Sequence, residues 1–122
     1  MKLAIGLEEN SYSSKIDRRF GRAGYFIIID SESKEYEIIE NQAKDEVSGA
    51  GLKVVKNLIA LGVDELVAGE IGPKAETLIK EFEIPVYRVG DCTYISEVLE
   101  KYSKGELERY TFPSMTSGLR MA

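Results

Sequence analysis

The sequence predicts an α/β domain in which a mixed sheet is packed against helices. In the second half of the chain, short apolar runs alternate with runs that carry apolar residues at helical spacing, a pattern typical of right-handed parallel crossovers. In the first half, two apolar runs are separated by only four polar residues, 31–34, which favours an antiparallel hairpin. The two patterns together predict a sheet with both parallel and antiparallel neighbours.

Three strands are expected in the first half. Lys2–Leu7 is mostly apolar, which indicates a central strand. Tyr25–Asp30 and Tyr36–Glu40 flank the predicted hairpin loop, so we expect them to run antiparallel. Residues 8–23 form a polar stretch without an apolar period. Loops of this length inside a compact domain are usually functional or mobile.

Helices alternate with two further strands in the second half. An apolar stripe predicts a helix over 51–61, and Pro73 stands where a first helical residue is expected. Thr93 is a candidate cap for a third helix. Short apolar runs at Glu65–Ala68 and 84–89 separate these helices and predict the fourth and fifth strands.

Length and composition predict one globular domain. The chain has 122 residues, of which 43% are hydrophobic and 30% charged, and this length supports a single core. We expect the domain to occupy residues 1–103 and residues 104–122 to form a flexible C-terminal tail, which either packs across the domain or is ordered by a partner. A monomer or a weak homo-oligomer is expected.

Several functional classes are disfavoured by composition. The chain has no histidine, which excludes imidazole catalysis and imidazole metal ligation, and one cysteine, which excludes an internal disulfide. A net charge of -5 argues against binding to nucleic acid. No apolar run approaches the roughly 20 residues that cross a bilayer, so we expect no membrane contact and a cytoplasmic location. Abundant Glu and Lys with a single glutamine is typical of proteins from thermophiles.

Glycine-bearing turns follow three of the predicted strands and open the three predicted helices. They lie at 47–51, 69–73 and 90–93. Helix N-termini leave amides unpaired and carry partial positive charge, so turns gathered at one edge of a sheet would form a site for an anion. The alternative is that these glycines serve only turns and helix packing. No Rossmann or Walker pattern follows any of the turns, so nucleotide binding is unsupported.

A basic segment supplies the second half of the predicted site. Residues 15–22 contain four cations, and the arginines flank an aromatic residue that can anchor the loop while the guanidinium groups face outward. Arginine presents planar donors suited to oxyanions. The alternative is a solvated loop. The candidate ligand-binding residues are Arg18, Arg19, Phe20, Gly21, Arg22, Ser48, Gly49, Ala50, Gly51, Gly69, Ile71, Gly72 and Pro73.

Cys92 is the candidate metal ligand. It lies in the third glycine turn, at the start of a predicted helix. A helix N-terminus lowers the pKa of a thiol and favours the thiolate, which is the form that binds metals. The alternative is a small buried residue that fills space in the core.

With these residues in place, the chain resembles the dinitrogenase iron-molybdenum cofactor biosynthesis family of nitrogenase accessory factors, which have a ribonuclease H-like fold. The resemblance covers about residues 1–102. It rests on early serines, on Asn41, and on five motifs in order, at 19–23, 49–51, 62–64, 69–75 and 84–87. It implies a five-stranded mixed sheet of order 3-2-1-4-5 with the second strand antiparallel.

The resemblance also implies a function. Family members are similar in binding, carrying or inserting anionic metal-sulfur clusters such as the iron-molybdenum cofactor or its precursors. We therefore expect a noncatalytic carrier of such a cluster, containing iron, molybdenum or both, with a cluster donor or acceptor protein as partner. Two alternatives stay open: a regulatory or interaction domain that binds a small organic anion or a partner, and a small enzyme that depends on Cys92.

Overall fold

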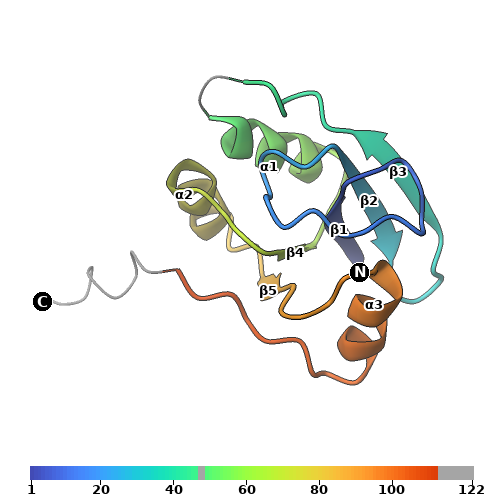
Figure 1. Cartoon of the computed structure of the whole chain (residues 1–122). Helices are drawn as coiled ribbons and strands as arrows, with labels where there is room; N and C mark the ends of the chain where they lie inside the picture. Colours follow the sequence, from blue (N-terminus) through green and yellow to red (C-terminus); the bar gives the residue numbers. More distant parts are fainter. Residues whose placement is uncertain (47–48, 113–122) are drawn as a thin grey trace, which may run out of the picture.

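The computed structural model describes residues 1–46 and 49–112, which form one layer of strands between helices (Figure 1). The five strands lie in the order β3-β2-β1-β4-β5. β1 pairs antiparallel with β2 and parallel with β4, while β3 pairs antiparallel with β2. The predicted order and the antiparallel second strand are confirmed. The strands are β1 (Lys2–Leu7), β2 (Tyr25–Asp30), β3 (Tyr36–Glu40), β4 (Glu65–Ala68) and β5 (Val86–Arg88).

Helices cover both faces of the sheet. α1 (Ala50–Ala60) and α2 (Pro73–Glu81) lie side by side on one face, and α3 (Ile95–Ser103) lies on the other (Figure 1). Side chains alternate across a strand, so β1 contributes Ala4 to the core under α1 and α2, and Leu3 to the core under α3. Two separate apolar cores result.

The helix starts agree with the prediction to within a residue or two, but two details differ. β5 is shorter than the predicted strand at 84–89, because Pro85 has no N–H and Gly90 takes a positive φ of 63°. The N-terminus of α3 is not capped by the Thr93 hydroxyl. The carboxylate of Glu97 accepts hydrogen bonds from the amides of Thr93 and Tyr94 at 2.7 and 2.9 Å, and these bonds lower the pKa of Glu97.

The long polar stretch crosses the ends of the central strands. The amide of Phe20 donates to the carbonyl of Glu70 at 3.0 Å, and the amide of Glu70 donates to the carbonyl of Arg18 at 2.7 Å. Nearer its start, the stretch forms a bridge between Ile16 and Leu7 of β1. These backbone bonds fix the segment 15–24, hereafter the arginine loop, against the turn that follows β4.

The first part of the predicted tail runs antiparallel along β5. Arg88 donates its amide to the carbonyl of Glu108, and Tyr110 donates its amide to the carbonyl of Val86, both at 2.8 Å. Phe112 is buried in the core under α1 and α2. The remainder of the tail lies outside the described residues, and the domain boundary at residue 103 stays a prediction.

Within the ranges 1–46 and 49–112, no helix combines the length and the apolar character that crossing a bilayer requires.

Candidate functional site

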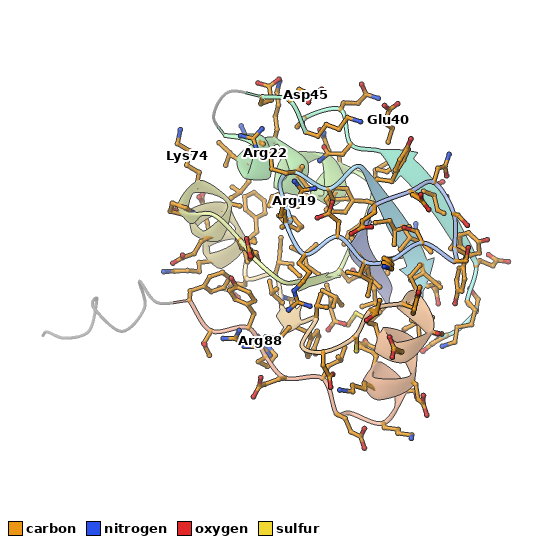
Figure 2. The ribbon with its side chains drawn as sticks, in the orientation of Figure 1. Arg19, Arg22, Glu40, Asp45, Lys74 and Arg88 are labelled. Carbon is orange, nitrogen blue, oxygen red and sulfur yellow. The ribbon has the colours of Figure 1, made fainter. Side chains whose placement is uncertain are left out.

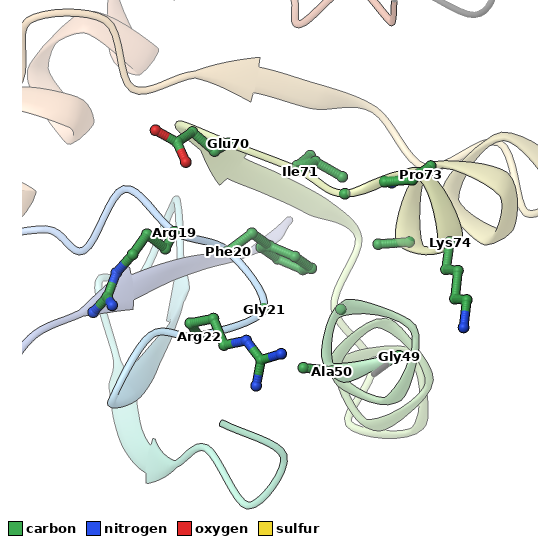
Figure 3. Close-up of a pocket in the computed structure, with 13 residues that line it drawn as sticks. Arg19, Phe20, Gly21, Arg22, Gly49, Ala50, Glu70, Ile71, Pro73 and Lys74 are labelled. Atoms are coloured by element: carbon green, nitrogen blue, oxygen red, sulfur yellow. The ribbon is translucent and has the colours of Figure 1, made fainter. Parts of the chain in front are cut away.

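A cavity of about 590 Å³ lies between the arginine loop and the N-termini of α1 and α2 (Figure 3). It stands beyond the carboxyl ends of the strands, where ligands bind in open α/β sheets. Most of the predicted site residues meet there. Those that line the cavity are Arg19, Phe20, Gly21, Arg22, Gly49, Ala50, Gly51, Ile71, Gly72 and Pro73.

Other predicted residues lie elsewhere. Arg18 is not among the lining residues, and its Nη1 donates to the carbonyl of Gly90 at 2.8 Å. Gly69 provides close packing, because a Cβ there would stand 2.8 Å from the carbonyl oxygen of Arg18. Ser48 lies outside the described residues.

Two of the three glycine turns line the cavity, and the third does not. The turn at 90–93 leads into α3, which packs on the opposite face of the sheet from α1 and α2. The expectation that three helix N-termini converge is therefore wrong for this turn. Two of its amides already have acceptors: Cys92 donates to the carbonyl of Val89 and Thr93 to the carboxylate of Glu97.

The N-termini of α1 and α2 leave backbone amides for a ligand. Their N-cap residues, Gly49 and Gly72, have no side chain to cap the helix. Among the described residues, nothing accepts a hydrogen bond from the amides of Gly72, Lys74 or Ala75. Unpaired amides at a helix N-terminus favour an anion.

The cavity glycines differ in what a side chain would meet. A Cβ at Gly21 would stand 2.8 Å from the amide nitrogen of Gly51, and a Cβ at Gly51 would stand 2.9 Å from the Cβ of Ala75. These two glycines allow the arginine loop, α1 and α2 to approach closely. At Gly49 and Gly72 a Cβ would meet nothing within 4 Å. The packing interpretation therefore holds for the first pair, while the second pair faces open space.

Arg19 is committed to a partner within the loop. Its Nη2 lies 2.8 Å from Oδ2 of Asp17 and its Nε lies 3.1 Å from Oδ1, which forms a bidentate ion pair. The Asp17 side chain is 5% exposed and the Arg19 side chain 64% exposed. The pair raises the pKa of Arg19, and Figure 3 shows the guanidinium directed away from Ala50. Much of its charge is already compensated.

Arg22 is directed toward the start of α1 (Figure 3). Its Nη1 donates to the carbonyls of Lys44 at 2.8 Å and Glu46 at 2.5 Å, which holds the segment before α1. No carboxylate among the described residues pairs with it. Its charge therefore remains available to an anion beside the N-terminus of α1.

The sequence interpretation missed three lining residues. Lys74, Glu70 and Ala75 also line the cavity. Lys74 lies at the same end of the molecule as Arg19 and Arg22 (Figure 2), and it forms no ion pair with the described residues. Its position directly after Pro73, in the first helical turn, was the signal that could have identified it.

Asn41 holds the arginine loop in place. Its side chain is buried, and Nδ2 donates to the carbonyls of Gly21 at 3.1 Å and Ala23 at 2.8 Å. Its Oδ1 accepts from the amide of Ala43 at 2.9 Å. Asn41 thus links the end of β3 to the loop that carries Arg22.

Cys92 does not have the environment that the sequence suggested. It is 4% exposed, packs in the core under α3, and is absent from the cavity lining. Burial raises the pKa of the thiol, so the expected exposed thiolate with a lowered pKa is wrong. The alternative, a buried residue that fills space, describes its surroundings. Its role as a metal ligand stays an untested prediction.

Within residues 1–46 and 49–112 there is also no group of three or more Cys, Asp or Glu side chains that could hold a metal ion. The cavity instead offers amides, two guanidinium groups, one ammonium group and a single carboxylate, Glu70. This set suits an anion that brings its own metal ligands, and it does not suit a bare metal ion.

The fold and the cavity define a small single-domain α/β protein with a crevice at the carboxyl ends of its strands. The chain belongs to the dinitrogenase iron-molybdenum cofactor family, whose model matches residues 1–105. It is 32% identical over 113 residues to an uncharacterized protein of Methanocaldococcus jannaschii, MJ0580, covering 90% of this chain and 92% of that protein.

Two solved structures share the fold. A putative NifB protein from Thermotoga is 35% identical with a TM-score of 0.77, covering 92% of this chain and 97% of that one. The apo form of the orange protein from Desulfovibrio gigas has a TM-score of 0.83 at 23% identity, covering 90% of this chain and 92% of that one. At that identity, the second likeness supports the fold alone.

Proposed function

We propose that this protein binds and carries an anionic metal-sulfur cluster as cargo, in the cavity between the arginine loop and the N-termini of α1 and α2. The main support for this proposal is that two helix N-termini without side-chain caps line one cavity, with open space at Gly49 and Gly72. The family name and the likeness to a putative NifB protein support a metal cluster as the ligand class.

Local charge supports an anion although the chain as a whole is acidic. The net charge is -5, yet the lining includes Arg22 and Lys74 against one carboxylate, Glu70, while the charge of Arg19 is largely compensated by Asp17. Direct hydrogen bonds to charged groups contribute about 1.5–3 kcal/mol each. Close contacts of this kind outweigh the repulsion from distant carboxylates, which ionic strength screens.

The lining also supports carriage rather than catalysis. Among the described lining residues there is no thiol and no imidazole, and Glu70 is the only carboxylate, so no acid/base pair faces the cavity. The cluster would keep its own sulfide ligands and be held by amides and cations. A Cys92-dependent reaction is disfavoured, because the buried thiol has a raised pKa.

A second candidate is a domain that binds a small organic anion or a partner's tail. It is favoured by the apolar part of the lining, which includes Phe20, Ile71 and Pro73. Such side chains could contact the carbon skeleton of a carboxylate ligand. The volume of about 590 Å³ falls in the usual range of roughly 300–1,000 Å³ for small-molecule sites.

The test begins with anaerobic purification, metal analysis and a visible absorption spectrum. The apoprotein is then titrated with tetrathiomolybdate, and separately with molybdate and citrate, by calorimetry. Tight binding of tetrathiomolybdate with weaker binding of the other two supports the cluster proposal. Preferential binding of citrate favours the organic-anion candidate, and no binding of any of the three contradicts an anion site.

Alanine variants of the cationic lining residues test where in the cavity the anion binds. We expect Arg22→Ala combined with Lys74→Ala to weaken tetrathiomolybdate binding at least about tenfold, since two charged hydrogen-bonding groups are lost. Arg19→Ala is the control, and we expect a change below about threefold because Asp17 already pairs with that guanidinium. Thermal unfolding reports whether each variant is folded. Equal effects from both would contradict this placement.

A further inference from the structure

The segment after α3 reaches the wall of the cavity. The hydroxyl of Tyr110 accepts a hydrogen bond from the amide of Ile71 at 3.2 Å. Ile71 belongs to the turn between β4 and α2 that lines the cavity. Tyr110 itself follows the end of the family match at residue 105, so this contact comes from a part of the chain that the family model does not cover.

The position of Tyr110 is fixed from several directions. Its amide donates to the carbonyl of Val86 at 2.8 Å. The guanidinium of Arg88 lies 5.0 Å from its ring centre, and the ring of Phe112 lies 5.0 Å away. Phe112 is in turn buried in the core under α1 and α2. A ring held in this way keeps its hydroxyl at a defined place.

The turn directs successive amides to opposite sides. The amide of Glu70 donates to Arg18 on the arginine loop, while the amide of Ile71 donates to Tyr110 on the other side. Neighbouring N–H groups alternate in extended backbone, and Gly72 has an extended conformation with φ -76° and ψ 166°. The Gly72 amide has no acceptor among the described residues, and Gly72 lines the cavity.

We propose that Tyr110 is a positioning residue for the anion site: its hydroxyl holds the Ile71 amide away from the cavity and thereby orients the amides of Gly72, Lys74 and Ala75 toward the ligand. The inference rests on the proposed function of the cavity. Pre-organised donors bind an anion better than donors that must be reoriented on binding.

The first test compares Tyr110→Phe with the wild type. Phenylalanine keeps the ring contacts with Arg88 and Phe112 and removes only the acceptor. We expect tetrathiomolybdate affinity to fall about three- to tenfold, the worth of one hydrogen bond, and amide exchange at Ile71 to accelerate. Thr111→Val is the matched control, since it removes the Arg88–Thr111 bond of 3.1 Å in the same segment and leaves the turn untouched.

The second test uses the wild type alone, so it does not depend on a variant that folds. In an NMR titration with tetrathiomolybdate, the amide resonances of Gly72, Lys74 and Ala75 are expected to shift strongly and that of Ile71 only slightly. A dominant shift at Ile71 would overturn the proposal, as would equal losses of affinity in Tyr110→Phe and Thr111→Val. If the wild type binds and Tyr110→Phe binds equally well, only the role of Tyr110 fails. If the wild type binds none of the anions, the proposed function fails with it.

Discussion

Gly72 and Gly51 both line the cavity, but they serve different purposes. Gly72 has an ordinary φ of -76° and nothing within 4 Å of an added Cβ. Neither conformation nor packing therefore requires glycine there. At Gly51 a Cβ would stand 2.9 Å from the Cβ of Ala75, so glycine is needed for α1 and α2 to approach. We propose that the glycine at position 72 leaves access for a ligand to the amides of α2.

Gly72→Asn separates binding from stability. Asparagine is a good N-cap residue, so its side chain can accept bonds from the first amides of α2 and change stability by only a few tenths of a kcal/mol relative to glycine. The same side chain would occupy the amides that we assign to the ligand. We expect tetrathiomolybdate affinity to fall at least about tenfold, the equivalent of about 1.4 kcal/mol, without a lower melting temperature.

Gly51→Ala is the control for this prediction. It should destabilise the fold by about 1–3 kcal/mol through overpacking against α2. Calorimetric titration and urea unfolding of both variants give the comparison. Undiminished binding by a folded Gly72→Asn variant would show that the ligand does not reach the start of α2.

The arginine loop keeps its shape through contacts with other elements rather than through its own periodicity. Asn41 holds it from the end of β3, and Glu70 holds it from the end of β4. Within the loop, the buried side chain of Asp17 accepts bonds from the amide and guanidinium of Arg19. A polar segment thus becomes one wall of the cavity because buried polar partners satisfy its backbone.

Asn41→Ala should therefore affect both stability and binding. Two carbonyls of the loop lose their donor and a buried amide loses its acceptor, so we expect the free energy of unfolding to fall by about 1–3 kcal/mol. Tetrathiomolybdate affinity, measured below the unfolding transition, should also fall because Arg22 is less well fixed. Asn57→Ala, at an exposed position of α1, should change stability by less than about 0.5 kcal/mol. Wild-type affinity in a destabilised Asn41→Ala variant would contradict the coupling.

The two faces of the sheet differ in what they carry: one borders the cavity, and the other packs α3. The cavity belongs to the face covered by α1 and α2. On the other face, the hydroxyl of Tyr102 in α3 donates to Oε1 of buried Glu65 in β4 at 2.7 Å. Burial and this bond raise the pKa of Tyr102 to about 12. The pair holds α3 against β4, on the face of the sheet opposite α1 and α2.

This pair predicts a loss of stability at alkaline pH. An unfolded chain loses the tyrosine proton near pH 10, while the folded protein retains it to about pH 12. Between these values the unfolded state binds fewer protons, so the free energy of unfolding falls as pH rises, and the contribution is fully present below pH 10. Urea unfolding from pH 9 to 12 should show a steeper decline in the wild type than in Tyr102→Phe. Parallel declines would contradict this assignment.

The sequence by itself determined the elements, the mixed sheet and two of the turns that line the cavity. These follow from local signals: apolar periodicity, Pro73 at a helix start, and glycine turns such as 69–73 that must lie at the carboxyl ends of strands. The family resemblance supplied the strand order, which the structure has.

Only the tertiary structure decided which side chains serve the cavity. In the folded chain Arg19 forms an ion pair with Asp17, and Lys74 joins the cavity lining. Arg18 donates a hydrogen bond to Gly90 outside the cavity, and Cys92 is buried on the opposite face of the sheet. The fold also brings Tyr110 to an amide 39 positions away. Such outcomes depend on which groups meet after the chain has folded, and a charge or a thiol acquires its properties from those neighbours, which no local pattern records.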